Sequence, residues 1–384
     1  MSDGTVGPMD SRADSSRRPG PLAGVRVVEV GGIGPGPFAA MMLSDLGADV
    51  VRVDRPGEDL RPTHAVLLRG RQSVVADLKS PDGLAVVLAL VDRADILIEG
   101  FRPGVAERLG FGPSVALERN PGLVYGRMTG WGQDGPYAAL AGHDLTYLAV
   151  AGVLDAFAGA DGRPVPPLNL LGDFGGGGML LALGVVSALW HARESGQGQV
   201  VDAAIVDGVA AMTAMHQSML GSGLWPAARG ANLFDGGAPF YRCYRTADDR
   251  WLAVGAIEPV FYDRFLGGLG VDPAEVGAAQ LEAEQWPRVA ALFADRIATK
   301  PLAEWVAVFA DLDACVAPVL TVVEARSDPH LSARGVYAAV PDSPDLVQPA
   351  PAPRFSATPT TADTPAPEPG AHTDVVARKL GLTR

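Results

Sequence analysis

Val-Arg-Val-Val-Glu-Val-Gly-Gly-Ile-Gly-Pro-Gly-Pro, residues 25–37, is the stretch on which the expected fold depends. Val25–Val30 is rich in β-branched residues, which predicts a strand, and Gly31–Pro37 is a turn rich in glycine and proline. Phe38–Leu46 then has the apolar spacing of a helix, and Ala48–Asp54 is a second β-rich run. A strand, a helix and a strand in this order predict a βαβ unit with parallel strands.

The same alternation continues along the chain and extends the predicted sheet. Further strands are expected at Ser73–Asp77, Ile96–Glu99, Val124–Met128 and Val200–Ala204, and helices at Pro81–Val91, Met179–Trp190 and Val206–Leu220. Repeated alternation of strands and helices is typical of an α/β fold, in which helices cover both faces of a parallel sheet. The sequence therefore predicts a large domain with a Rossmann-like sheet.

A second, smaller domain of the α+β class is expected after a segment rich in Gly, Ala and Pro. Its predicted elements are a hairpin, Phe240–Tyr244 with Trp251–Val254, and helices at Pro259–Leu269, Trp286–Thr299 and Leu302–Leu312. The stretch Leu346–Pro369 is too dense in proline for regular structure. The expected boundaries are 1–19 for a disordered extension, 20–223 for the large domain, 224–237 for a linker, 238–325 for the small domain and 326–384 for a segment that returns to the large domain.

The charge of the chain favours a small anionic ligand over a nucleic acid. The 384 residues carry a net charge of −13, whereas phosphate backbones require clustered Lys and Arg. Basic residues nevertheless concentrate in the first third of the chain, where they are expected to form one local patch. They are Arg52, Arg55, Arg61, Arg69, Arg71, Lys79, Arg102 and Arg108.

The cysteines and the apolar runs indicate a cytoplasmic protein. Cys243 and Cys315 are too few for a disulfide framework, suit a reducing compartment and are expected to be buried small apolar residues. The first nineteen residues lack the apolar core of a secretory signal. Met179–Trp190, the longest apolar run, is too short to span a bilayer.

Two motifs carry groups suited to proton transfer. Gly142-His143-Asp144 offers an imidazole, and Gly172-Asp173-Phe174, followed by Gly175–Gly178, offers a carboxylate before an apolar helix. Histidine titrates near neutrality and is a frequent acid or base. By themselves, His143 is also consistent with a structural loop residue, and Asp173 with a helix N-cap. The six histidines have no metal-ligand spacing, so no metal is expected.

The Gly32-x-Gly34 turn, with Asp54 at the end of the second strand, also suggests a dinucleotide site. Pro37 stands where the fingerprint has its third glycine, and Arg52 and Arg55 flank Asp54. Nicotinamide binding is therefore disfavoured, and a tight strand-to-helix turn explains the glycines equally well.

Several phrases together resemble the family III CoA transferases, also called CaiB/BaiF. They are Gly-Ile-Gly-Pro-Gly-Pro (32–37), Arg-Gly-Arg (69–71), Ala-Asp-Leu-Lys (76–79), Gly-Phe-Arg-Pro-Gly (100–104), Thr-Gly-Trp-Gly-Gln (129–133), Gly-Gln-Gly-Gln-Val-Val-Asp-Ala (196–203) and Val-Gly-Ala-Ile-Glu-Pro (254–259). The resemblance runs from about Pro21 to past Phe355. It implies a homodimer in which each chain threads through an opening in the other.

The resemblance also implies the roles of individual residues. His143 and Asp173 match the two acid/base groups of the family's racemases, and Glu258 matches a partner of the histidine. The substrate is a CoA thioester, with no separate cofactor. The residues implied at the CoA moiety are Ile33, Arg55, Ala76, Asp77, Leu78, Lys79, Gly100, Phe101, Arg102, Arg108, Gly142, Asp144, Leu145, Thr146 and Tyr147.

Two reactions of the family fit these residues. In a racemase, an isomerase that interconverts (2R)- and (2S)-2-methylacyl-CoA, His143 and Asp173 exchange one α-proton through an enolate. N–H groups around Asp173 and Gly175–Gly178 are expected to bind its oxygen. In a CoA transferase, Asp173 attacks the thioester. His143 with Glu258 favours the racemase. Met212, Met215 and Met219 have helical spacing, which indicates either core packing or a flexible surface for the acyl chain.

Overall fold

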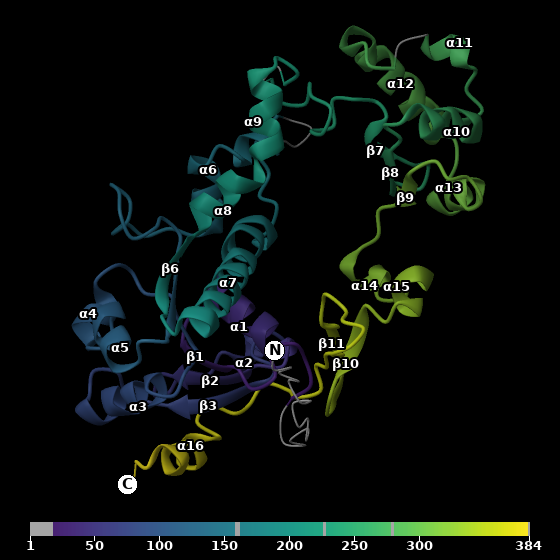
Figure 1. Ribbon diagram of the computed structural model, residues 1–384. Helices are drawn as coiled ribbons and strands as arrows, with labels where there is room; N and C mark the ends of the chain where they lie inside the picture. Colours follow the sequence, from purple (N-terminus) through teal and green to yellow (C-terminus); the bar gives the residue numbers. More distant parts are fainter. Residues whose placement is uncertain (1–17, 158–161, 226–227, 278–279, 383–384) are drawn as a thin grey trace, which may run out of the picture. The chain divides into compact units, whose positions relative to one another are not determined.

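The computed structural model describes residues 18–157, 162–225, 228–277 and 280–382. The chain forms two compact units, each drawn in Figure 1. The large unit comprises Met1–Tyr147, Asn169–Gly208 and Gly335–Arg384, and the small unit comprises Leu148–Leu168 and Val209–Arg334. Residues 148–168 and 209–223, expected in the large domain, and residues 326–334, expected in the segment that returns to it, belong to the small unit.

A six-stranded parallel sheet forms the centre of the large unit, so the prediction of a parallel α/β fold is confirmed. Its strand order is β3-β2-β1-β4-β5-β6. The strands are β1 (Arg26–Val30), β2 (Asp49–Asp54), β3 (Arg71–Val75), β4 (Ile96–Glu99), β5 (Val124–Thr129) and β6 (Gln199–Ala204). The order reverses between β1 and β4, the position at which sheets of this kind bind ligands.

Helices cover both faces of this sheet (Figure 1). One face packs on α3 (Pro81–Val91), α4 (Val105–Leu109), α5 (Pro113–Arg119) and α16 (Thr373–Leu380), and the other on α1 (Pro35–Asp45) and α7 (Leu180–Ser195). The central strands β1, β4 and β5 are buried on both sides, which explains their largely apolar sequences, whereas the edge strand β6 is partly exposed. At Gly126 an added Cβ would lie 2.9 Å from Val185, so a glycine in β5 lets α7 approach closely.

The turn between β1 and α1 is tighter than the sequence indicates. The helix begins at Pro35, three residues before the predicted Phe38, because proline is favoured in the first turn of a helix. Gly34 precedes it with φ at 70°, a conformation that glycine adopts readily. The turn therefore carries no side chain at residue 34, where an added Cβ would lie 3.3 Å from Oδ2 of Asp173.

Three of the eight basic residues expected on a surface patch are buried instead. Arg52 and Arg71 both bind the carboxylate of Glu29, and Arg69 binds Asp45. These arginines are neutralised inside the fold because β1, β2 and β3 are neighbours, which the composition of the chain does not reveal. Arg52 and Arg71 also donate to the carbonyl oxygens of Gly32 and Pro37. The ion-paired arginines thus hold both ends of the β1–α1 turn by hydrogen bonds.

The helix that carries Asp173 begins earlier than expected. A π-helix, η2 (Leu170–Met179), leads directly into α7, and Asn169 is its N-cap. The prediction that Asp173 caps a helix is therefore wrong, because Asp173 lies inside the first turn. The helix predicted at Met179–Trp190 is therefore present but longer at both ends. Together the two segments span 26 residues, long and apolar enough to cross a membrane by length and composition, so the prediction that this run is too short to do so is wrong. The inner face of α7 packs on β5 and β6.

The small unit contains a three-stranded antiparallel sheet with helices packed against it. Its strands are β7 (Tyr241–Arg245), β8 (Trp251–Gly255) and β9 (Val316–Pro318). Aromatic side chains of α10 (Pro259–Leu269), α12 (Trp286–Ile297) and α13 (Leu302–Phe309) fill its core. Both predicted strands and all three predicted helices are present. The single helix expected at Val206–Leu220 is interrupted at Thr213, between α8 (Ile205–Met212) and α9 (Ala214–Gly221).

Four side chains of this region are exposed where the sequence favoured burial. Cys243 and Cys315 are exposed, so their prediction as buried residues is wrong. Cys243 alternates with the buried Tyr244 along β7 and therefore points away from the core. Cys315 lies in a turn with φ at 53°. Met212 and Met215 are also exposed, which excludes the core-packing interpretation for these two residues.

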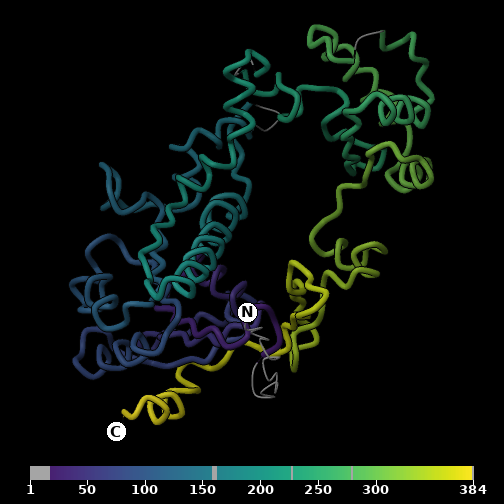
Figure 2. Tube along the Cα trace, in the orientation of Figure 1, coloured from purple at the N-terminus to yellow at the C-terminus, as the bar shows by residue number. Residues whose placement is uncertain are grey.

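The C-terminal segment returns to the large unit and runs beside β3 (Figure 2). It opens with a hairpin of β10 (Tyr337–Val340) and β11 (Ser343–Pro349), so the prediction of irregular structure is wrong for residues 346–349. The prolines here are compatible with a strand because this sheet has only two strands, both at an edge. His372 N–H then donates to the carbonyl oxygen of Ser73, at 2.9 Å.

Disorder was predicted for residues 1–19, of which residues 1–17 lie outside the described part of the chain and only Arg18 and Pro19 are described. Arg18 donates to Ser44 and to the carbonyl oxygen of Gly70. The remaining short elements are α2 (Arg61–His64), α6 (Asp144–Val150), η1 (Leu154–Ala156), α11 (Pro273–Val276), η3 (Ala283–Gln285), α14 (Val322–Ala325) and α15 (Pro329–Ala333).

Candidate active site

A cavity of about 510 Å³ opens at the carboxyl ends of the parallel strands in the large unit. Its walls come from the β1–α1 turn, the residues after β2, β4 and β5, the segment before α6, and the first turn of η2. The cavity thus lies where the strand order reverses between β1 and β4, the site at which open α/β sheets bind ligands. The topology of the sheet therefore explains its position.

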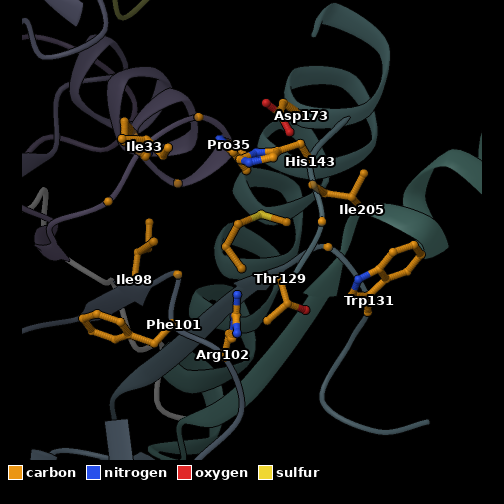
Figure 3. A pocket seen from close by; sticks show the side chains of 18 of the residues that line it. Ile33, Pro35, Ile98, Phe101, Arg102, Thr129, Trp131, His143, Asp173 and Ile205 are labelled. Carbon is orange, nitrogen blue, oxygen red and sulfur yellow. The ribbon is translucent and has the colours of Figure 1, made fainter. Parts of the chain in front are cut away.

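Nine of the predicted site residues line this cavity. They are His143 and Asp173, together with Ile33, Arg55, Gly100, Phe101, Arg102, Gly142 and Tyr147. Figure 3 shows His143 and Asp173 beside each other near Pro35, with Arg102 and Phe101 at the other end of the cavity. An imidazole and a carboxylate therefore lie beside each other in the cavity, while the guanidinium group of Arg102 stands apart from them.

The other predicted CoA contacts in the large unit lie outside the cavity lining. Lys79 and Arg108 are exposed, and the backbone N–H of Lys79 donates to Asp77. The remaining members of this group are Ala76, Asp77, Leu78, Asp144, Leu145 and Thr146. Thr146 is already engaged, since its hydroxyl donates to the His143 carbonyl oxygen. Their contacts with CoA stay predictions.

Glu258 belongs to the small unit, where it is the exposed N-cap residue of α10. Its backbone carbonyl accepts from Phe261 and Tyr262, while its side chain makes no capping bond to this helix. The carboxylate is thus not used by its own helix. Its predicted partnership with His143 stays a prediction.

His143 is fixed by the start of α6. Its backbone N–H donates to the Thr146 hydroxyl at 3.0 Å, and its carbonyl oxygen accepts from the N–H groups of Thr146 and Tyr147. The ring of Tyr147 packs against Gly130 and Gly142, where any Cβ would overlap it. The backbone that carries the imidazole is therefore held by hydrogen bonds on one side and an aromatic ring on the other.

Asp173 lies in an environment that favours its neutral form. Burial raises the pKa of this carboxyl and the negative charge of Asp144 raises it further, while a hydrogen bond from Asn169 and the neighbouring His143 act in the opposite direction. The Asp173 N–H donates to Oδ2 of Asp144 at 2.6 Å. A raised carboxyl pKa in a cavity is typical of a functional acid or base.

The expected oxyanion donors are not available as predicted. The Asp173 N–H is occupied by Asp144, and Gly175–Gly178 lie within the π-helix, beyond the first turn that holds the unpaired N–H groups of a helix end. The glycines instead permit close packing. An added Cβ at Gly178 would lie 2.7 Å from the carbonyl oxygen of Pro35. This part of the prediction is therefore wrong.

The loop after β4 is held by a buried carboxylate. Glu99 accepts the N–H of Phe101 at 2.6 Å and Nε of Arg127 at 3.1 Å. Burial raises the pKa of Glu99 to about 7, although both of these hydrogen bonds lower it. The position of Phe101 and Arg102 at the cavity thus depends on a group that titrates near neutrality.

Replacing Glu99 with Gln is expected to make stability less dependent on pH. The folded state holds a proton on Glu99 up to about pH 7, whereas the unfolded state releases it near pH 4.5. Stability therefore falls as pH rises through this window, by up to roughly 3 kcal/mol. Urea unfolding at pH 5 and pH 8 measures the difference. E99Q should lose less stability than wild type over this interval, and an equal loss in both proteins would contradict the assignment. E118Q, at an exposed carboxylate, is the control.

Several cavity residues were not predicted, although the predicted strands indicate where they lie. Thr129 ends β5, and Gly130 and Trp131 follow it directly, at the same edge as the turns after β1 and β4. The strand assignments alone place them there, because the carboxyl ends of parallel strands share one edge. Trp131 packs edge-on against Tyr147 at 4.7 Å, and its indole Nε1 is buried with no hydrogen-bond partner among the described residues.

Asp54 has a structural role at the end of β2. It accepts from Nε of Arg52 and from the Ser73 hydroxyl, both at 2.6 Å. A ribose-binding acidic residue needs a carboxylate that is free to accept from the sugar. These contacts agree with the interpretation of residues 31–37 as a strand-to-helix turn.

Comparison with known proteins identifies the family. The model of CoA-transferase family III matches residues 22–373, and the chain belongs to this family. It is 45% identical to the α-methylacyl-CoA racemases of Mus musculus and Homo sapiens, over 94% of this chain and of each of theirs. A CaiB/BaiF family protein from Brucella suis has a similar structure, with a TM-score of 0.82 and 25% identity over 94% of this chain and all of the other.

Proposed function

We propose that this protein is an α-methylacyl-CoA racemase that interconverts (2R)- and (2S)-2-methylacyl-CoA thioesters. The observation that carries the proposal is that His143 and Asp173 lie beside each other in the same cavity. The 45% identity to racemases over nearly the full chain supports the same reaction. The substrate supplies the CoA, and the thioester acidifies the α-carbon without a separate cofactor.

The reaction moves one proton between two faces of one carbon. One of the two groups removes the α-proton, and the electron pair of the broken C–H bond delocalises onto the thioester oxygen as an enolate. The other group, which carries a proton, delivers it to the opposite face, and the C–H bond reforms with inverted configuration. Each turnover leaves the proton on the group that lacked it at the start, which is the form needed for the reverse direction.

The surroundings of Asp173 support this exchange. Because the two epimers are nearly equal in free energy, the two groups work best when their basicities are similar. An ordinary carboxyl is a much weaker base than an imidazole. Burial and the negative charge of Asp144 raise the pKa of Asp173 and so bring it nearer to that of histidine.

The proposed binding of CoA places its phosphates near the cationic side chains. Arg55 and Arg102 are exposed at the cavity and can bind phosphate oxygens, a geometry for which guanidinium groups are well suited. Ile33 is also exposed there and offers an apolar contact. We include Glu258 as the partner of His143, because its carboxylate is exposed and is not used to cap α10.

A CoA transferase is the alternative reaction. The Asp173 carboxylate lines the cavity, with one oxygen facing Gly34, and a nucleophile in this position is chemically suited to attack a thioester. That mechanism needs a single carboxylate and no second proton carrier. His143 in the same cavity therefore favours racemisation.

One experiment separates the two reactions. A single 2-methylacyl-CoA epimer is incubated with the protein in deuterated water, with and without a free carboxylic acid as acceptor. Racemisation predicts deuterium at the α-carbon and a mixture of epimers in both samples. CoA transfer to the added acid, with no deuterium incorporated, would overturn the proposal and establish the transferase.

A further inference from the structure

Asp144 joins the two segments that carry the proton-transfer groups. It directly follows His143 in the chain and begins α6. Its side chain is buried, at 8% exposure, and its Oδ2 accepts the backbone N–H of Asp173 at 2.6 Å. One carboxylate thus connects the backbone next to the imidazole with the backbone of a residue 29 positions away.

Gly172 makes this contact possible. A Cβ added to Gly172 would lie 2.4 Å from Oδ2 and 2.8 Å from Cγ of Asp144, and the three atoms nearest to it would all belong to Asp144. Even the smallest side chain at residue 172 would therefore displace the Asp144 carboxylate. The glycine before Asp173 serves as the space into which Asp144 fits.

We propose that Asp144 is a positioning residue, which holds Asp173 at a fixed separation from His143, and that Gly172 provides the room for it. This inference rests on the proposed racemase function and deepens it. The resemblance to the family implied a different role for Asp144, a contact with CoA. Its burial, its position outside the cavity lining and its bond to the Asp173 N–H all favour the positioning role.

The charge of Asp144 adds a second effect to the positional one. Two charged or titratable groups at the start of α6, His143 and Asp144, interact with the carboxylate of Asp173. The charges of Asp173 and of Arg102 both act on Tyr147. Among these groups Asp144 is the one that raises the pKa of Asp173 by charge, while His143 lowers it. Removing the negative charge of Asp144 therefore makes Asp173 a stronger acid.

Three variants test the proposal through the epimerisation rate. D144A removes the hydrogen bond and is expected to lower kcat by about tenfold to a hundredfold, the size of effect that a misplaced reacting group produces. KM for the thioester should stay within about twofold, because CoA contacts are intact. G172A should lower kcat similarly, and in the D144A background it should have no further effect, because there it has no carboxylate to displace.

D144N tests the effect of the charge by itself. The amide oxygen can still accept the Asp173 N–H, but the negative charge is lost. Activity that needs ionised Asp173 disappears as pH falls through its pKa, so this acidic limb of kcat/KM should move to lower pH in D144N. D82N removes an exposed carboxylate from the first turn of α3 and serves as the matched control. It should leave the pH profile unchanged.

Three outcomes would overturn the proposal. In the first, D144A retains kcat but has a higher KM or a higher dissociation constant for free CoA. In the second, G172A has equal effects in the wild-type and D144A backgrounds. In the third, D144N has an unchanged pH profile. The first would restore the CoA-contact role. Failure of the proposed function is distinguished in the same assay, because the wild-type protein would then not epimerise the thioester.

Discussion

H143A is expected to lose inversion of the α-carbon by about 10² to 10⁴-fold, the usual contribution of a general acid or base. The single-epimer assay in deuterated water also shows which epimer still exchanges its α-proton. With His143 absent, Asp173 still faces one side of the α-carbon, so deuterium exchange should persist for at most one epimer and without inversion. D173N should show the opposite preference, because its remaining group is the imidazole.

This complementary pattern is specific to two groups on opposite faces. A transferase that uses Asp173 as nucleophile would lose activity in D173N and keep it in H143A. H330A, at an exposed histidine of α15, is the control for loss of an imidazole by itself and should keep full activity. Full inversion by H143A would show that the two-base mechanism is wrong, and identical exchange of both epimers in both variants would do the same.

E29Q is expected to lower the free energy of unfolding by about 3 to 5 kcal/mol, because it removes the carboxylate that binds buried Arg71 and one of the two that bind buried Arg52. Glu29 is 1% exposed and binds Arg52 and Arg71 together. Burial would raise the pKa of Glu29, but the two arginines lower it below its ordinary value, so the group is ionised in the folded protein.

Urea unfolding of E29Q and wild type at neutral pH measures this effect. D92N is the matched control, because Asp92 binds Arg119 at the surface and exposed pairs contribute about 1 kcal/mol or less. A loss in E29Q no larger than in D92N would show that the buried ion pairs are not needed for stability. Because Arg52 and Arg71 also bind the carbonyl oxygens of Gly32 and Pro37, E29Q should weaken CoA binding as well.

The regular elements of the large unit were predictable because their signals are local. Pro81–Val91 begins and ends where the sequence indicates, since Ser80 caps it by accepting the Gly83 N–H and proline occupies its first position. The parallel sheet follows from the alternation of strands with helices. Once the strands are in order, the cavity at the β1/β4 reversal follows too, and with it the residues after β5.

Features that depend on contacts distant in the sequence were not predictable. The buried arginines have the composition of a surface patch, and only the adjacency of β1, β2 and β3 places Glu29 between them. The run Gly175–Gly178 has a low intrinsic preference for helix, and its π-helix forms because α1 packs closely against it. The bond from Asp173 to Asp144 joins the first turn of η2 to the start of α6, and no local pattern indicates that these two helices approach each other.

The number of residues in the π-helix at Leu170–Met179 also matters for function, because it sets the position of Asp173. A π-helix has a wider turn than an α-helix and accommodates an extra residue, and such segments are frequent at functional sites. Deleting one residue here would let the chain rewind as an α-helix and rotate every side chain before the deletion relative to α7. The carboxylate of Asp173 would then move away from its position beside His143 in the cavity. In homologous chains, a one-residue gap in this segment should therefore be as informative about loss of racemisation as a substitution of Asp173 itself.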